Sequence, residues 1–328
     1  MQPKKEKDMS RRPVNHDHTQ TVSEGMAAES AALLLTGSLC AEAFADDAAG
    51  AADAPASENA GRDGITVLGT RGSLPVSGKD FLRFGGATTC FLVRMDGELI
   101  LLDAGTGMAR IPKDVLSAPQ ISLLLSHPHV DHMQGIPMCP YLSQKTANLS
   151  VYAAEHGGLN TESQILAFFS PPLWPINPTM MPGKSIFHDM KEAFRIGDVL
   201  VEFMEGVHPG GVSLFKLTGS RKTLVFATDC TLTDELRPKL QEFAEGCDVL
   251  MIDGQYSDDE WKGRETYGHT RWTEAARFGQ DCHAACVKII HHDPNHTDDD
   301  LDAAESEAKA ICRQCSFARE GEIIPLQE

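Results

Sequence analysis

The chain has 328 residues, 41% of them hydrophobic, so it can bury the core of one large domain or of two ordinary ones. Its 47 Asp and Glu residues outnumber its 29 Lys and Arg residues, and an acidic surface repels nucleic-acid backbones, which makes long DNA or RNA a poor candidate substrate. No apolar run reaches the roughly 18 residues that span a bilayer, so we expect a soluble protein without a membrane anchor.

Residues 1–62 differ in composition from the rest of the chain. They are rich in Ala with Ser, Glu and Asp and hold few large side chains, which predicts a disordered leader. A signal peptide is the alternative, with Ala31–Leu39 as its apolar segment and Ala43–Ala45 as a small-residue cleavage site. Glu24 and Glu29 precede that segment and argue against export, so a cytoplasmic location is the expectation.

From residue 63 onward the pattern is that of a folded domain. Ile65–Gly69 is typical of a first strand. Two further strands, Thr89–Met95 and Glu98–Asp103, are joined by Asp96-Gly97, a pair that favours tight hairpin turns. The domain therefore begins with a small antiparallel unit.

The most informative stretch is residues 121–137, which read ISLLLSHPHVDHMQGIP. Its apolar start predicts a short buried strand. Four potential metal ligands follow that strand: His127, His129, Asp131 and His132. Imidazole and carboxylate groups suit Zn, Mn or Fe, and the spacing lets the first two histidines point one way while the other two ligands turn to a neighbouring position. A polar loop with scattered histidines is the alternative, but such crowded side chains serve no purpose unless a cation organises them.

Residues 155–189 form the least regular part of the domain. A helix is predicted at Asn160–Phe169, and the proline-rich residues after it cannot continue that helix. Phe168, Phe169 and Trp174 fit either a lid over a substrate pocket or a segment that covers the core.

The second half of the domain alternates strands and helices. Strands are predicted at 199–205, 212–217, 222–228, 248–253 and 286–290, and helices at 234–245, from 269 onward and at 298–312. Polar residues follow the strands or open a helix: His208, Asp229, His269 and the adjacent pair His291 and His292. Because neighbours on a strand point to opposite sides, only one of the pair can join a metal site.

The His-x-His-x-Asp-His signature, followed by Gly135 and Pro137, resembles that of the metallo-β-lactamase-fold hydrolases. Residues 69–75, which read GTRGSLP, and Gly268-His269-Thr270 resemble loops of the phosphodiesterase branch, which includes the tRNA 3′-processing enzymes. The resemblance implies an α/β fold for residues 63–328, a four-layered αβ/βα sandwich of two mixed β-sheets flanked by helices. In tRNA-processing relatives an arm with basic residues corresponds to residues 155–189, where this chain has only Lys184.

The resemblance also implies a ligand set for two divalent metal ions, with zinc as the first choice and Mn or Fe as alternatives. The first metal takes His127, His129 and His208, and the second takes Asp131, His132 and His292. Asp229, in an intact Ala-Thr-Asp motif, bridges the two. Asp103, in the family's Asp-x-Gly motif, either accepts a hydrogen bond from a ligand imidazole or caps the helix that follows.

The resulting hypothesis is a hydrolase with Asp131, Asp103 and His269 in its catalytic machinery. Two cations that share a water lower its pKa, and a protonated His269 neutralises charge on phosphorus oxygens or protonates the leaving group. The preferred substrate is a small or cyclic nucleotide-like phosphodiester, and a homodimer is possible. The alternatives are a thioesterase, a lactonase or a β-lactamase of the same fold, or a metal-binding module without turnover.

Overall fold

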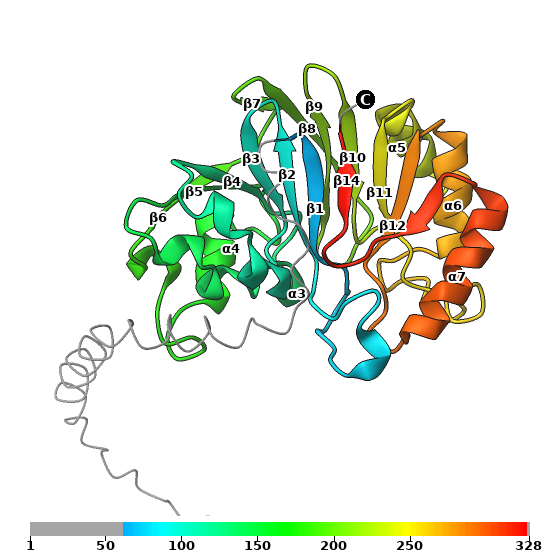
Figure 1. Ribbon diagram of the computed structural model, residues 1–328, viewed down its shortest axis with the longest axis horizontal. Coiled ribbons are helices and arrows are strands. Elements are labelled where there is room, and N and C mark those ends of the chain that lie inside the picture. Colours follow the sequence, from blue (N-terminus) through cyan, green and yellow to red (C-terminus); the bar gives the residue numbers. More distant parts are fainter. Residues whose placement is uncertain (1–61, 327–328) are drawn as a thin grey trace, which may run out of the picture. The chain divides into compact units, whose positions relative to one another are not determined.

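A computed structural model describes residues 62–326 of the chain (Figure 1). The predicted leader and its signal-peptide alternative lie outside these residues. None of the helices within residues 62–326 is long and apolar enough to cross a membrane.

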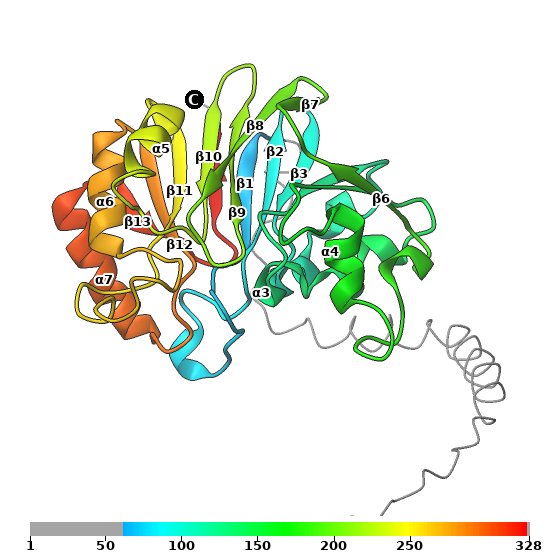
Figure 2. The ribbon, with the colours of Figure 1, turned by 180° about the vertical axis from the view of Figure 1, so that it is seen from behind.

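Two seven-stranded sheets form the middle of the domain (Figures 1 and 2). The first sheet has the order β14 (Ile323–Pro325), β1 (Gly64–Gly69), β2 (Cys90–Met95), β3 (Glu98–Leu102), β4 (Ile121–Leu124), β5 (Asn148–Ala153) and β6 (Lys184–Asp189). The second has the order β13 (Cys315–Phe317), β12 (Cys286–Ile290), β11 (Val249–Asp253), β10 (Thr223–Ala227), β9 (Val212–Thr218), β8 (Val199–Gly206) and β7 (Phe194–Ile196).

Both sheets are mixed and follow similar pairing rules. In the first sheet β14, β1, β2 and β3 pair antiparallel, whereas β3 to β6 pair in parallel. In the second, β7 to β10 are antiparallel and β10 to β13 parallel. Parallel strands need crossover segments to connect them, and those segments supply the helices on the outer faces.

The helices cover the outer faces of the sheets, which gives four layers (Figure 2). The α-helices are α3 (Val130–Met133), α4 (Thr161–Phe168), α5 (Arg237–Ala244), α6 (Trp272–Asp281) and α7 (Asp298–Ile311). Short 3-10 turns are η2 (Lys79–Phe81), η3 (Thr106–Arg110), η4 (Lys113–Val115), η5 (Ile136–Met138), η6 (Tyr141–Ser143) and η7 (Pro178–Met180). The predicted four-layered sandwich of two mixed sheets is confirmed.

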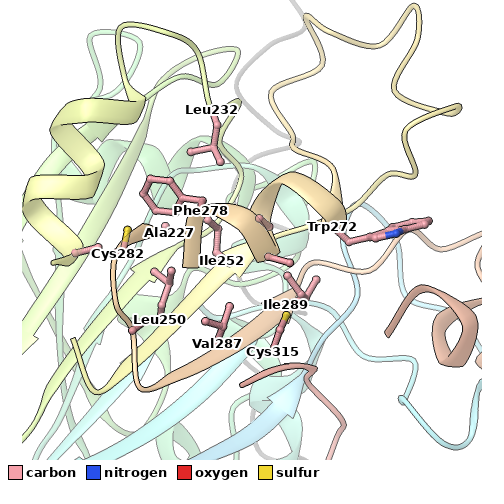
Figure 3. Packing of buried hydrophobic residues seen from close by; sticks show 14 of the residues in the cluster. Ala227, Leu232, Leu250, Ile252, Trp272, Phe278, Cys282, Val287, Ile289 and Cys315 are labelled. Carbon is pink, nitrogen blue, oxygen red and sulfur yellow. The ribbon is translucent and has the colours of Figure 1, made fainter. Parts of the chain in front are cut away.

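Three apolar clusters hold the layers together. Between the sheets, Phe91 and Phe226 are fully buried with their ring centroids 5.7 Å apart. On the outer face of the second sheet, Phe278 of α6 packs on Leu250 and Ile252 of β11 (Figure 3). Full burial of each such side chain stabilises the fold by about 1.5–3 kcal/mol.

Capping residues mark the starts of two of the helices. Asn160 caps α4 by accepting a hydrogen bond from the Ser163 amide, and Thr297 forms a capping box with Asp300 at the start of α7. The helix predicted from residue 234 begins only at Arg237, where a proline occupies the first turn, a position that tolerates it.

The aromatic residues of segment 155–189 pack on the outer face of the first sheet. Phe169 is fully buried in that cluster, and its ring centroid lies 5.0 Å from that of Phe168 and 5.5 Å from that of Trp174. Of the two interpretations left open by the sequence, these contacts favour a segment that covers the core.

Candidate metal centre

The loops that follow β4, β8, β10, β11 and β12 bring histidine and aspartate side chains from distant parts of the chain together. Carboxyl ends of parallel strands meet at one edge of a sheet, which is where ligands bind in α/β folds. Asp103 and His291 come directly after β3 and β12, and Asp229 comes two residues after β10; their φ angles are positive, at 57°, 62° and 47° in that order. This backbone conformation is uncommon for residues other than glycine and is typical of functional sites.

The first cluster consists of His127, His129 and His208. The Nε2 atom of His127 and the Nδ1 atom of His129 lie 2.9 Å apart, and Nε2 of His208 lies 3.0 Å from that same Nδ1. Burial lowers the pKa of His127 well below its usual range and that of His208 to about 4. Three neutral imidazoles that aim nitrogens at one point match the form in which histidine binds a metal.

The second cluster consists of Asp131, His132, Asp229 and His291, all buried. Nε2 of His132 lies 3.3 Å from Oδ2 of Asp131 and 3.2 Å from Oδ2 of Asp229. Nε2 of His291 lies 3.3 Å from Oδ2 of Asp131 and 3.1 Å from Oδ1 of Asp229.

Asp229 of the second cluster also faces the first cluster. Its Oδ2 is also 3.7 Å from Nε2 of His127 and 3.9 Å from Nε2 of His208. A carboxylate in this position faces imidazoles of both clusters, which is the geometry a bridging ligand requires.

The choice of His292 for the second cluster was wrong. Its Nε2 donates to the Ala318 carbonyl at 2.9 Å, and its ring stacks on Phe317 at 5.2 Å, so it belongs to the core. His291 faces Asp131 and Asp229 instead. Strand alternation does not extend past Ile290, because the left-handed backbone at His291 redirects the chain.

A cation fits the second cluster because of an unpartnered ligand atom. Nδ1 of His132 donates to Asp103 at 2.7 Å, which leaves the lone pair of Nε2 aimed at two carboxylates. That buried Nε2 has no hydrogen-bond partner. Burial disfavours a charge on His132, yet Asp229 and Asp131 together raise its pKa well above the usual range, so the carboxylates require positive charge here.

Asp103 supports both clusters from behind. Besides the His132 ring, it accepts hydrogen bonds from the Ser126 amide at 2.7 Å and the Ser126 hydroxyl at 2.8 Å. Because that hydroxyl donates to Asp103, its oxygen accepts from Nδ1 of His127 at 3.0 Å. The following turn, η3, begins after Gly105 without a side-chain cap, so Asp103 accepts from the His132 imidazole and from Ser126 rather than capping a helix.

His269 lies beside both clusters. Its Nδ1 donates to Asp253 at 2.7 Å, its ring stacks on His291 at 4.9 Å, and it meets the His208 ring edge-on at 5.2 Å. Burial disfavours the charged ring, but carboxylates, foremost Asp253, raise the pKa of His269 above its usual value.

Several residues around the site had no role in the sequence-based hypothesis. Asp253 orients His269, Gln255 contacts His291 at 3.1 Å, and the amide of Ser73 donates to Asp131 at 2.7 Å. Asp253 has a recognisable pattern, because it is the last residue of a buried strand, and Asp103 and Asp229 also lie at or just after the ends of strands. Ser73 lies in the 69–75 loop that the sequence singles out, but it acts through its backbone amide, a role that its side chain does not reveal.

Comparison with known proteins identifies the family. Residues 99–292, well over half of the chain, match the family described as "Beta-lactamase superfamily domain". The chain belongs to this superfamily. The resemblance stated from the sequence is thereby confirmed, and with it a metal-dependent hydrolase of this superfamily.

Relatives of this superfamily member include enzymes named ribonuclease Z. One from Treponema pallidum is 22% identical over an alignment of 307 residues, and the match covers 79% of this chain and 96% of the relative. Another, from Streptomyces avermitilis, is 23% identical over 290 residues, covering 75% of this chain and 91% of the relative.

Solved structures share the fold of this superfamily member at low sequence identity. The metallo-β-lactamase fold protein YhfI from Bacillus subtilis has a TM-score of 0.59 at 20% identity, covering 80% of this chain and 99% of its own. A diphosphatase from the PhnP family has a TM-score of 0.60 at 16% identity, covering 81% and 98%. The short form of human tRNase Z has a TM-score of 0.57 at 16% identity, covering 81% and 100%.

Proposed function

We propose that the protein is a dinuclear metal hydrolase that cleaves small phosphodiesters. His127, His129 and His208 hold the first divalent cation, and Asp131, His132 and His291 hold the second, with Asp229 between them. Mixed nitrogen and oxygen ligands suit zinc first, with Mn or Fe as alternatives. Two cations in these positions supply an activated water and polarise the ester oxygen when they are bound.

The observation that carries the phosphodiester assignment is the buried pair of His269 and Asp253. Asp253 accepts from Nδ1 at 2.7 Å, so Nε2 of His269 is the ring nitrogen left for substrate. A proton on that nitrogen neutralises charge on phosphoryl oxygens or passes to the leaving alkoxide. Attack on a carboxylic or thioester carbonyl creates only one anionic oxygen, whereas attack on a phosphodiester leaves negative charge on several oxygens. A proton donor such as His269, in addition to the cations, therefore favours phosphorus chemistry. The ribonuclease Z names of the relatives support the same reaction class.

The residues next to the site in the chain favour a small substrate over a long polyanion. Four exposed apolar side chains are direct chain neighbours of site residues: Leu74, Val130, Val207 and Tyr267. They adjoin Ser73, His129, His208 and Gly268 in that order. None of these four exposed positions is basic, whereas a long polyanion needs basic side chains.

Hydrolysis assays on the zinc-loaded protein test the proposal. Bis(p-nitrophenyl) phosphate should be cleaved in preference to S-lactoylglutathione and to a chromogenic cephalosporin. Cleavage of only the thioester or the cephalosporin contradicts the phosphodiester assignment. A precursor tRNA cleaved more efficiently than the small diester would retain the chemistry and reject the small substrate.

The His269→Ala variant tests the residue on which the assignment rests. We expect kcat for the diester to fall by about 10²–10⁴-fold, the usual contribution of a positioned general acid or base. His283→Ala is the matched control, because His283 also donates to a carboxylate at 2.7 Å but is exposed and lies outside the two clusters. Full activity of His269→Ala removes this residue from the mechanism.

A further inference from the structure

His291 differs from the other imidazoles of the two clusters in the group behind it. His132 donates to the Asp103 carboxylate, and His208 donates to the Gly268 carbonyl at 2.9 Å. Behind His291 lies a neutral side-chain amide, that of Gln255, which is only 3% exposed.

The amide of Gln255 links His291 to a second carboxylate. Its Oε1 lies 3.1 Å from Nδ1 of His291, and its Nε2 donates to Oδ2 of Asp293 at 3.2 Å. Asp293 also accepts from the backbone and side-chain nitrogens of Asn295, both at 2.8 Å. The ionised carboxylate accepts hydrogen bonds only, so it fixes the amide nitrogen of Gln255 toward itself and the oxygen toward His291.

This orientation determines which ring nitrogen of His291 carries the proton. Oε1 of Gln255 accepts, so Nδ1 of His291 must donate, and Nε2 keeps its lone pair. That lone pair points at Asp131 and Asp229, at 3.3 Å and 3.1 Å, where the second cation is assigned.

The position of the His291 ring is confined by its neighbours. The rings of His132 and His269 stack on it at 5.4 Å and 4.9 Å, with interplanar angles of 14° and 18°. Gly72 also lies against it, since a Cβ atom built on this glycine would come within 2.2 Å of the ring. Stacking fixes the plane of the ring but does not distinguish its two nitrogens, so the hydrogen bond to Gln255 decides the tautomer.

We propose that Gln255 is a positioning residue that holds His291 in the tautomer that binds the second metal and so sets the affinity of that site. The inference rests on the metal assignment made under the proposed function. An amide suits position 255 better than a carboxylate or an apolar side chain. A carboxylate oxygen would face Asp293 at about the same 3.2 Å. An apolar side chain would leave two buried polar groups unpaired, Nδ1 of His291 and Oδ2 of Asp293.

Zinc binding by three full-length variants tests the inference. Gln255→Met removes both hydrogen bonds at similar volume and should weaken the second zinc by roughly 10–100-fold, as loss of a partner behind a ligand does. The first zinc should bind as in the unchanged protein. Gln255→Glu restores the acceptor and should recover part of the lost affinity, whereas a purely structural role predicts a further loss from the buried charge.

Gln164→Met is the matched control. Gln164 is 1% exposed and also uses its amide in two hydrogen bonds, to the carbonyls of Ala154 and Leu159, outside the two clusters. It should lower thermal stability without changing either zinc affinity. Chelator competition measures the affinities, and elemental analysis gives the zinc content.

The outcomes separate this inference from the one on which it rests. An unchanged protein that binds no zinc overturns the metal assignment and this inference together. If the unchanged protein binds two zinc ions and Gln255→Met binds the second zinc with unaltered affinity, only the role of Gln255 is overturned. If that variant does not fold, ring ¹⁵N spectra of the zinc-loaded unchanged protein decide, because a proton on Nε2 of His291 contradicts the proposed tautomer.

Discussion

The two clusters differ in charge and in exposure. His127, His129 and His208 offer three imidazoles, and His129 is exposed to solvent. The second cluster places Asp131 and Asp229 beside two imidazoles in full burial. Two buried carboxylates need compensation by positive charge, whereas neutral imidazoles do not, so the second cluster depends more strongly on a bound cation. Asp229 faces imidazoles of both clusters, and Asp103 contacts His132 directly and reaches His127 through Ser126, so both residues connect these unlike environments.

Asp229→Asn should have the largest effect, since it removes the charge shared by both clusters. We expect the loss of at least one metal and a fall in activity of about 100-fold or more, beyond the usual effect of an outer partner. Elemental analysis and diester hydrolysis measure the two effects. Retention of both metals with full activity would show that the carboxylate does not bridge.

His291→Ala and His292→Ala should behave differently although the residues are adjacent. The first variant should lose the second metal and its activity. The second should keep both metals and lose about 2 kcal/mol of folding free energy, because it deletes a buried ring packed on Phe317. Metal content and chemical denaturation of both variants measure this contrast, and the reverse pattern would reinstate His292 as the ligand.

Asp103→Asn and Ser126→Ala should separate the clusters further. Asp103 contacts His132 directly and reaches His127 through Ser126, so its variant should weaken both metals by roughly 10–100-fold. Ser126→Ala should weaken mainly the first metal, to a smaller extent. Chelator competition on both variants measures the affinities for the two metals. Equal weakening of both metals by Ser126→Ala would contradict the proposed link from Asp103 through Ser126 to His127.

Glu305→Gln should have the smallest effect. It measures how the free energy of unfolding depends on acid at a residue away from the metals. Burial disfavours the Glu305 anion, but hydrogen bonds from Arg319 and the Phe317 amide prevail and lower its pKa from 4.5 to about 2. A lowered pKa in the folded state stabilises the protein above pH 4.5, and this contribution disappears as the pH falls through 2.

Denaturation of the metal-free protein and of Glu305→Gln between pH 2 and 7 measures that contribution. The free energies of unfolding should differ near pH 7 and converge in acid. A difference that grows toward low pH would contradict the lowered pKa. With this baseline, acid loss of metal from the two clusters can be distinguished from acid unfolding.

The sequence by itself determined much of the site, because His127, His129, Asp131 and His132 lie within six residues and their spacing needs no distant contact. The alternation of strands and helices likewise indicated the layers. His208 and Asp229 were placed by family resemblance, since nothing local to either residue reveals its partners.

Only the tertiary structure decided between His291 and His292, because one left-handed residue at the end of β12 reverses the alternation that a continuing strand would impose. It also decided the partners of His269 and His291, since Asp253 and Gln255 lie 16 and 36 residues away from them. Hydrogen bonds between distant side chains depend on how loops meet after the sheets pack, and packing is a property of the whole chain.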